Sequence, residues 1–147
     1  MHSHIIREGK LTLEYYSEGS GQNTLICFHG HGRKVEDFLF LAKKNRKLIL
    51  IVLPHHGKSK FPIEQIENQP LKIQEFNSIF AKILEKEAID DFHFIGFSQG
   101  GRFALSLLPF YKDRLKSVQL ISPDGMDPMS FYNRISRMRF ARLLFEK

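Results

Sequence analysis

The chain has 147 residues, of which 42% are hydrophobic and 26% are charged, a composition typical of one soluble globular domain. This composition excludes disordered and collagen-like chains. Residues 128–147 contribute +4 of the net charge of +6, because they hold five basic residues and one acid. The rest of the chain is nearly balanced in charge. We therefore expect no nucleic-acid partner, since such a partner requires basic residues along a whole face.

Cys27 is the only cysteine, so the sequence excludes a disulfide framework and a thiolate metal cluster. The His2/His4 and His29/His31 pairs lack neighbouring carboxylates or thiolates, and we predict neither a metal site nor a cofactor. No apolar run approaches the roughly 18 residues of a membrane span, and the first residues lack the apolar stretch of a signal peptide. We expect a cytoplasmic protein.

In chain order, residues 4–16 alternate polar and apolar side chains around a Glu-Gly-Lys turn, which predicts a β-hairpin at a sheet edge. Residues 24–28 and 47–53 are continuous apolar runs, typical of strands that are buried on both faces. Between these runs, apolar residues at helical spacing predict a helix over residues 35–42.

The alternation continues through the second half of the chain. Residues 71–87 have the apolar spacing of an amphipathic helix, and residues 92–97 form a third apolar run. A helix is predicted over 99–108 and a strand over 117–122. The spacing beyond these elements predicts one more helix over 128–145, with Phe131, Ile135 and Met138 on one face.

This order of elements predicts an α/β protein. We expect a three-layer α/β/α sandwich, in which the sheet is mostly parallel after the N-terminal antiparallel hairpin. We interpret residues 1–125 as the core and residues 126–147 as the start of a lid or cap helix.

A Gly-x-Ser-x-Gly motif covers residues 96–100, at the end of a predicted strand and the start of a predicted helix. Small residues at Gly96 and Gly100 allow the tight turn that would expose Ser98. The backbone N–H of Gln99 would then lie at a helix N-terminus, which favours negative charge. The His29-Gly30-His31-Gly32 loop after an earlier strand is the expected source of a second N–H donor to an oxyanion.

With the loop at residues 53–59, Leu-Pro-His-His-Gly-Lys-Ser, these motifs resemble the α/β-hydrolase superfamily, in its esterase- and lipase-like, lid-bearing branch. The loop is similar to the family's Leu-Pro-Gly-His-Gly-x-Ser, with His55 in place of the first glycine. The resemblance implies that Ser98 is the nucleophile and that the N–H groups of Gln99 and His31 form the oxyanion hole. It assigns structural roles in these motifs to His29, Gly30, Gly32, His56, Gly96 and Gly100.

The chain departs from the family's order of nucleophile, acid and histidine, because all seven histidines precede Ser98. Asp124 is a candidate acid, although Pro-Asp-Gly is also an ordinary turn. His55 and His56 are alternative bases, and a role for His56 in tying its loop down by hydrogen bonding is favoured. We expect a chain truncated before the acid and histidine of the triad, and before the last strands of the fold.

Two functions follow from these patterns. The first is a serine hydrolase that cleaves a small-molecule ester or thioester through a Ser98 acyl-enzyme, with little activity as the chain stands. The second is a non-catalytic interaction module on the same scaffold. Without the last strands, residues 118–121 would form an open sheet edge, which favours a homodimer or the docking of a missing C-terminal half.

Overall fold

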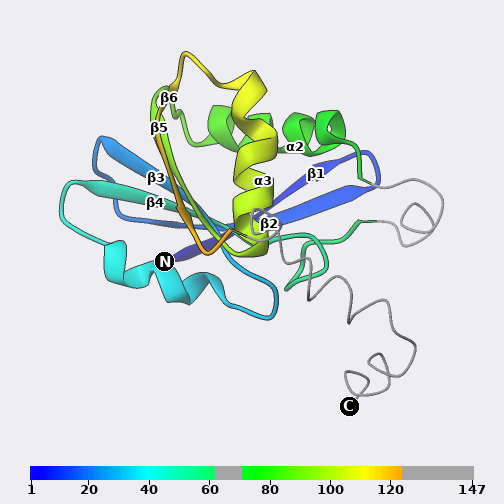
Figure 1. Cartoon of the computed structure of the whole chain (residues 1–147), viewed down its shortest axis with the longest axis horizontal. Helices are drawn as coiled ribbons and strands as arrows, with labels where there is room; N and C mark the ends of the chain where they lie inside the picture. Colours follow the sequence, from blue (N-terminus) through cyan, green and yellow to red (C-terminus); the bar gives the residue numbers. More distant parts are fainter. Residues whose placement is uncertain (62–70, 124–147) are drawn as a thin grey trace.

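The computed structural model describes residues 1–61 and 71–123 (Figure 1). These residues form a six-stranded sheet of order β1-β2-β4-β3-β5-β6. The hairpin strands pair antiparallel, β2 pairs antiparallel with β4, and the remaining pairs are parallel. The strands are β1 (His2–Glu8), β2 (Leu11–Glu18), β3 (Asn23–Phe28), β4 (Arg46–Ile51), β5 (Phe92–Phe97) and β6 (Leu115–Ile121).

Helices cover both faces of this sheet. Figure 1 shows α2 (Ile73–Lys86) and α3 (Gln99–Leu107) on one side, and η1 (Val35–Leu41, cyan) on the other. A short η2 segment, Leu108–Phe110, follows α3 directly. The three-layer α/β arrangement expected from the sequence is confirmed.

Two of the described helical elements, η1 and the short η2, are not α-helices. The η1 segment is a 3₁₀ helix, in which the N–H groups of Asp37 and Ala42 donate to the carbonyls of Lys34 and Leu39. Seven residues without a side-chain N-cap make few i→i+4 bonds, so the tighter i→i+3 pattern prevails. Apolar spacing alone does not distinguish the two helix types.

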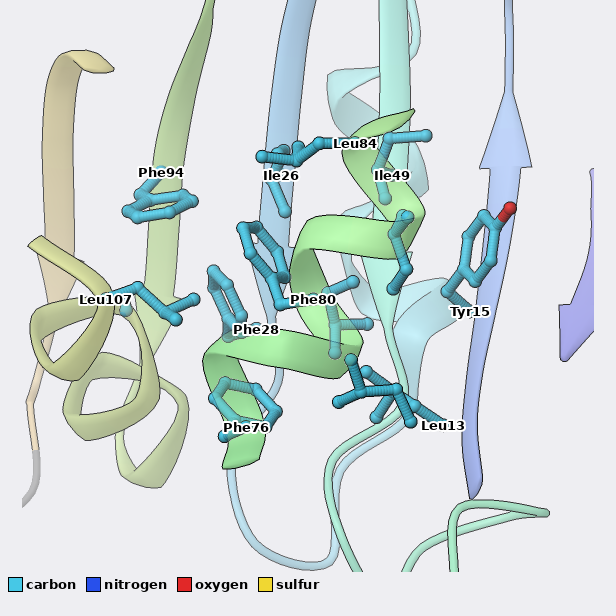
Figure 2. Close-up of a cluster of buried hydrophobic side chains, with 14 of the residues drawn as sticks. Leu13, Tyr15, Ile26, Phe28, Ile49, Phe76, Phe80, Leu84, Phe94 and Leu107 are labelled. Carbon is cyan, nitrogen blue, oxygen red and sulfur yellow. The ribbon is translucent and has the colours of Figure 1, made fainter. Parts of the chain in front are cut away.

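The main core lies between the sheet and the two α-helices. Figure 2 shows aromatic side chains from β3, α2 and β5 meeting there. The Phe28 and Phe94 rings are 5.3 Å apart and nearly perpendicular, and Phe80 lies 5.9 Å from Phe94. A smaller cluster on the other face includes Leu25, Cys27 and Phe38. Because β3 is covered on both faces, its sequence is continuously apolar rather than alternating.

β6 forms the edge of the described sheet, as expected from the sequence. Its Val118 and Leu120 side chains pack against the main core, whereas Ile121 is 47% exposed. Phe40 on η1 is 75% exposed. The predicted lid segment, residues 126–147, lies outside the described residues. Within the described ranges, no helix is long and apolar enough to span a membrane.

Candidate active site

Ser98 lies between the end of β5 and the start of α3, with a φ of +50° and a ψ of −121°. A positive φ is unfavourable for a residue with a β-carbon, at a cost of about 1–3 kcal/mol. The Ser98 N–H donates to the Ile121 carbonyl at 3.0 Å, and its carbonyl accepts from the Gly101 N–H at 2.9 Å. These bonds to β6 and to the first turn of α3 hold the serine in its strained conformation.

Two glycines make this turn possible. A β-carbon at Gly96 would lie 2.6 Å from the Gly101 Cα, and one at Gly100 would lie 2.0 Å from the Phe28 carbonyl oxygen. Side chains do not approach backbone atoms so closely. The first turn of α3 therefore packs directly on the backbone of β3.

The loop that follows β3 lies beside the serine. A β-carbon at Gly30 would be 3.2 Å from the Ser98 Cβ and 2.8 Å from the Phe97 ring. The loop turns sharply, because the Arg33 N–H donates to the Gly30 carbonyl at 3.1 Å. The structure thus brings together two segments that are nearly 70 positions apart in the chain, and both carry the N–H groups assigned to an oxyanion hole.

His29 connects this loop to the segment after β4. It is 2% exposed, and its Nε2 accepts the Leu53 N–H at 3.0 Å. Its Nδ1 lies 2.7 Å from the Gly30 carbonyl oxygen, so Nδ1 carries the proton and donates it. Burial lowers the pKa of His29, which keeps the ring neutral. Both ring nitrogens are engaged in this way.

His56, in the loop after β4, makes the reverse connection to the loop after β3. Its Nε2 accepts the Gly32 N–H at 3.3 Å, and its Nδ1 donates to the Pro54 carbonyl at 3.0 Å. The His29 and His56 rings are 4.7 Å apart at an angle of 76°. The two imidazoles therefore join the loop after β3 to the loop after β4.

His55 is exposed and has a φ of +65°. This left-handed conformation is one that glycine adopts easily, which explains the glycine at this position in the Leu-Pro-Gly-His-Gly-x-Ser motif that the loop resembles. Among the described residues, no hydrogen bond joins a histidine to the Ser98 hydroxyl. Asp124, the candidate acid, lies outside the described residues. The structure thus brings Ser98 and the loop after β3 together, while the roles of nucleophile, oxyanion donor, base and acid stay predictions.

Glu14 is a residue of this region that the sequence did not single out. Its side chain is 2% exposed, and its Oε2 accepts the Lys58 N–H at 2.7 Å. Its Oε1 accepts from the hydroxyls of Ser3 and Tyr16 at 3.2 and 3.1 Å. Nearby, the buried Ser59 hydroxyl accepts the Glu14 N–H and donates to the Val52 carbonyl. The loop at residues 53–59 is thus fixed to β2.

A cavity of about 310 Å³ lies beside the serine loop on the η1 face of the sheet. Gly30 and Phe97 form part of its wall, and the Arg33–Asp37 ion pair, at 2.8 Å, also lines it. The remaining lining is mainly apolar and includes Phe38, Phe40, Leu41, Ile95 and Ile121. Residues 1–61 and 71–123 contain no group of three or more His, Cys, Asp or Glu side chains that could hold a metal ion.

Comparison with known proteins gives the same fold. A family model described as the alpha/beta hydrolase fold matches residues 23–146. Two acetyltransferase components of acetoin cleaving systems, from Cupriavidus necator and Pseudomonas putida, are each 26% identical to the chain. These matches cover 78% and 80% of the chain but only 30% and 31% of the relatives.

Several solved structures share the architecture. Est816, an enzyme that degrades N-acyl homoserine lactones, matches 95% of the chain with a TM-score of 0.68 and 21% identity, over 54% of its own length. The haloalkane dehalogenase DatA from Agrobacterium tumefaciens matches 98% of the chain with a TM-score of 0.69 and 15% identity, over 51% of its length. The chain belongs to the α/β-hydrolase fold family. It spans about a third of the curated relatives and about half of these structures.

Proposed function

We propose that the chain carries the nucleophile half of a serine hydrolase that cleaves an ester or thioester through a Ser98 acyl-enzyme. The observation that carries this proposal is the Ser98 conformation, with a φ of +50° at the first turn of α3 and Gly30 against its Cβ. A serine at this position favours acyl transfer over dehalogenation, which uses a carboxylate nucleophile. The likeness to Est816 supports this choice, because the lactones that it degrades are cyclic esters.

In the proposed reaction, the Ser98 hydroxyl attacks the acyl carbonyl and loses its proton to a base. The N–H groups of Gln99 and His31 stabilise the oxyanion, and the N-terminus of α3 adds a favourable dipole. The alcohol or thiol leaves as the acyl-enzyme forms, and water then releases the acid. The apolar cavity beside Gly30 and Phe97 has space for a small acyl group.

The base is the open part of this proposal. Both ring nitrogens of His29 and of His56 are used in hydrogen bonds, one across to the other loop and one within its own loop. All seven histidines precede Ser98. We propose that the histidine comes from polypeptide beyond this sequence and that Asp124 is the acid. The open edge of β6 is the proposed attachment point for that polypeptide or for a second copy of the chain.

Two further assignments belong to the same proposal. The sequence pattern supports the proposal that residues 126–147, which lie outside the described residues, begin a lid with Phe131, Ile135 and Met138 on one face. The protein is proposed to act in the cytoplasm, in keeping with a sequence that has a single cysteine, Cys27.

The test is covalent labelling by a fluorophosphonate, followed by intact mass measurement on the 17.2 kDa chain. We expect slow labelling of the wild type that accelerates when imidazole is added as a substitute base, and no labelling of Ser98→Ala under either condition. Equal labelling of the alanine variant would show that Ser98 is not the nucleophile. Fast labelling without imidazole would show that the base lies within these residues.

A non-catalytic interaction role is the second candidate. It is favoured by the position of β6 at the edge of the described sheet, where Ile121 is exposed. This role predicts a stoichiometric dimer or hetero-complex in light scattering. A chain that stays monomeric at tens of micromolar and captures no partner would contradict it.

A further inference from the structure

Glu14, a buried charged residue, has no role in the proposed reaction. Glu14 lies on β2, and its Oε2 binds the backbone N–H of Lys58. A β-carbon on Gly57 would approach the same oxygen to 2.6 Å, so the loop backbone lies directly against the carboxylate. Because Gly57 also has a φ of +49°, glycine is required at this contact.

The segment that links the Lys58 backbone to His56 is part of the 53–59 loop, which is short and held by hydrogen bonds of its own. The His56 N–H donates to the Leu53 carbonyl at 3.1 Å, and the Ser59 N–H donates to the His56 carbonyl at 3.0 Å. These turns leave little freedom between the anchored backbone of Lys58 and the imidazole of His56. A restraint on one therefore acts on the other.

The chain of contacts ends beside the nucleophile. His56 accepts the N–H of Gly32, which follows His31 directly, and Gly32 has a φ of +65°. The bond to Gly32 restrains the peptide that follows His31, and it thereby limits the backbone position of His31, whose own N–H is the proposed donor. An oxyanion donor has to lie within about 2.7–3.1 Å of its target, and an error of about 1 Å is enough to lose on the order of 100-fold in rate.

We propose that Glu14 is a positioning residue for the oxyanion loop. Its carboxylate anchors the 53–59 loop so that the His56 imidazole accepts the Gly32 N–H and holds residues 29–32 beside Ser98. The role of this link in catalysis rests on the proposed function. The link itself, from Glu14 through Lys58 and His56 to Gly32, is a structural statement that can be tested separately.

The experiment compares three variants of the whole chain. Glu14→Met keeps the side-chain length but removes the acceptor, whereas Glu14→Gln keeps a carbonyl oxygen for the Lys58 N–H. Ser3→Ala is the matched control, because it removes a partner of Oε1 and leaves the Oε2 bond intact. Circular dichroism establishes that each variant is folded.

The first measurement is nuclear magnetic resonance of the link itself. In Glu14→Met we expect the Gly32 amide to exchange at least about tenfold faster and the His56 ring nitrogens to lose their single tautomer. Glu14→Gln and Ser3→Ala should match the wild type. If Glu14→Met is folded and both signals are unchanged, the proposal is wrong. Should that variant not fold, Glu14→Asp, whose carboxylate is one methylene shorter, is expected to give the same changes at smaller size, and unchanged signals in it overturn the proposal.

The second measurement is the rate at which the fluorophosphonate labels Ser98 in the presence of imidazole. We expect a loss of at least about tenfold in Glu14→Met and recovery in Glu14→Gln. Unchanged labelling in a Glu14→Met protein whose Gly32 signal has moved would overturn the positioning role. A wild type that does not label at all would contradict the proposed function, and the resonance measurement would still decide whether Glu14 holds Gly32.

Discussion

The backbone of Gly100 passes so close to Phe28 that a β-carbon at position 100 would lie 2.0 Å from the Phe28 carbonyl oxygen. The first turn of α3, which directly follows Ser98, thus rests on the last residue of β3. Because Phe28 is fully buried in the main core, the position of Ser98 depends on the packing of the whole α2–α3 face.

Alanine substitutions at Gly100 and Gly101 should distinguish the close contact between Gly100 and Phe28 from a general effect of alanine on α3. In Gly100→Ala, we expect a loss of at least about 2 kcal/mol in the free energy of unfolding, since the Phe28 backbone cannot move without disturbing β3. In Gly101→Ala, the new atom would meet the Pro123 Cβ at 3.0 Å. The better helix propensity of alanine, about 1 kcal/mol, offsets much of that strain. Urea denaturation measures both, and equal losses would contradict the assignment.

The strained conformation of Ser98 predicts a conflict between stability and reactivity. Glycine adopts a φ of +50° without cost, whereas alanine retains the strain of serine. We expect Ser98→Gly to be more stable than Ser98→Ala by about 1 kcal/mol, while neither variant reacts with the fluorophosphonate. Thermal denaturation of the two variants is the measurement. A glycine variant that is less stable than the alanine variant would show that the turn is not strained.

His55, which also has a positive φ, should respond to substitution in the same way. Its φ of +65° predicts that His55→Gly raises the free energy of unfolding by about 0.5–1 kcal/mol relative to His55→Ala. His56→Gly is the contrasting variant, because it removes the bonds to Gly32 and Pro54 and should destabilise the protein. If His56→Gly also stabilised the protein, the bonds of His56 to Gly32 and Pro54 would not contribute to stability, and the prediction would be contradicted.

The sequence predicted most of the strands and helices because their side-chain periods are strong. The apolar runs that became β3, β4 and β5 are buried on both faces, and such runs are clear without a structure. The position of β4 between β2 and β3 was not predicted, since it depends on crossover connections rather than on local pattern. The 3₁₀ form of η1 was missed because its apolar spacing also fits an α-helix.

The parts of the candidate site were unequally predictable. The Gly-x-Ser-x-Gly motif indicated the turn at Ser98 because sterically demanding turns restrict residue choice. Glu14 gave no signal, since alternation places it on the opposite face of β2 from Leu13 and Tyr15, where a charged residue is ordinary. Its burial comes from the 53–59 loop, which is far away in sequence. Long-range contacts of this kind leave no local pattern.

Stability should depend on pH through His29, whose pKa burial lowers in the folded protein. The unfolded chain, with an ordinary histidine pKa of about 6.5, then binds more protons than the folded protein in the window below that value. The free energy of unfolding that depends on His29 is therefore fully present above about pH 6.5. It is lost as the pH falls from that value toward the lower pKa of His29 in the folded protein. Urea midpoints between pH 8 and pH 5 measure this loss. Midpoints that stay constant over this range would contradict the prediction.

The thiol of Cys27 offers a probe of global opening. It is 0% exposed on β3, and burial raises its pKa, so neither access nor ionisation favours reaction. We expect Ellman's reagent to react with the native protein only at the rate at which the core opens, and immediately in concentrated urea. Prompt reaction under native conditions would contradict the burial of β3.

The order of the strands also has a consequence for synthesis. Once β4 has been made, it fills the space between β2 and β3, and four strands are then paired. β5 adds beside β3 and β6 adds beside β5, each against a strand that the ribosome has already released. Among the six described strands, each one from β4 onward finds its partner already synthesised. The sheet can therefore assemble while the chain is still being translated, from its centre toward the β6 edge.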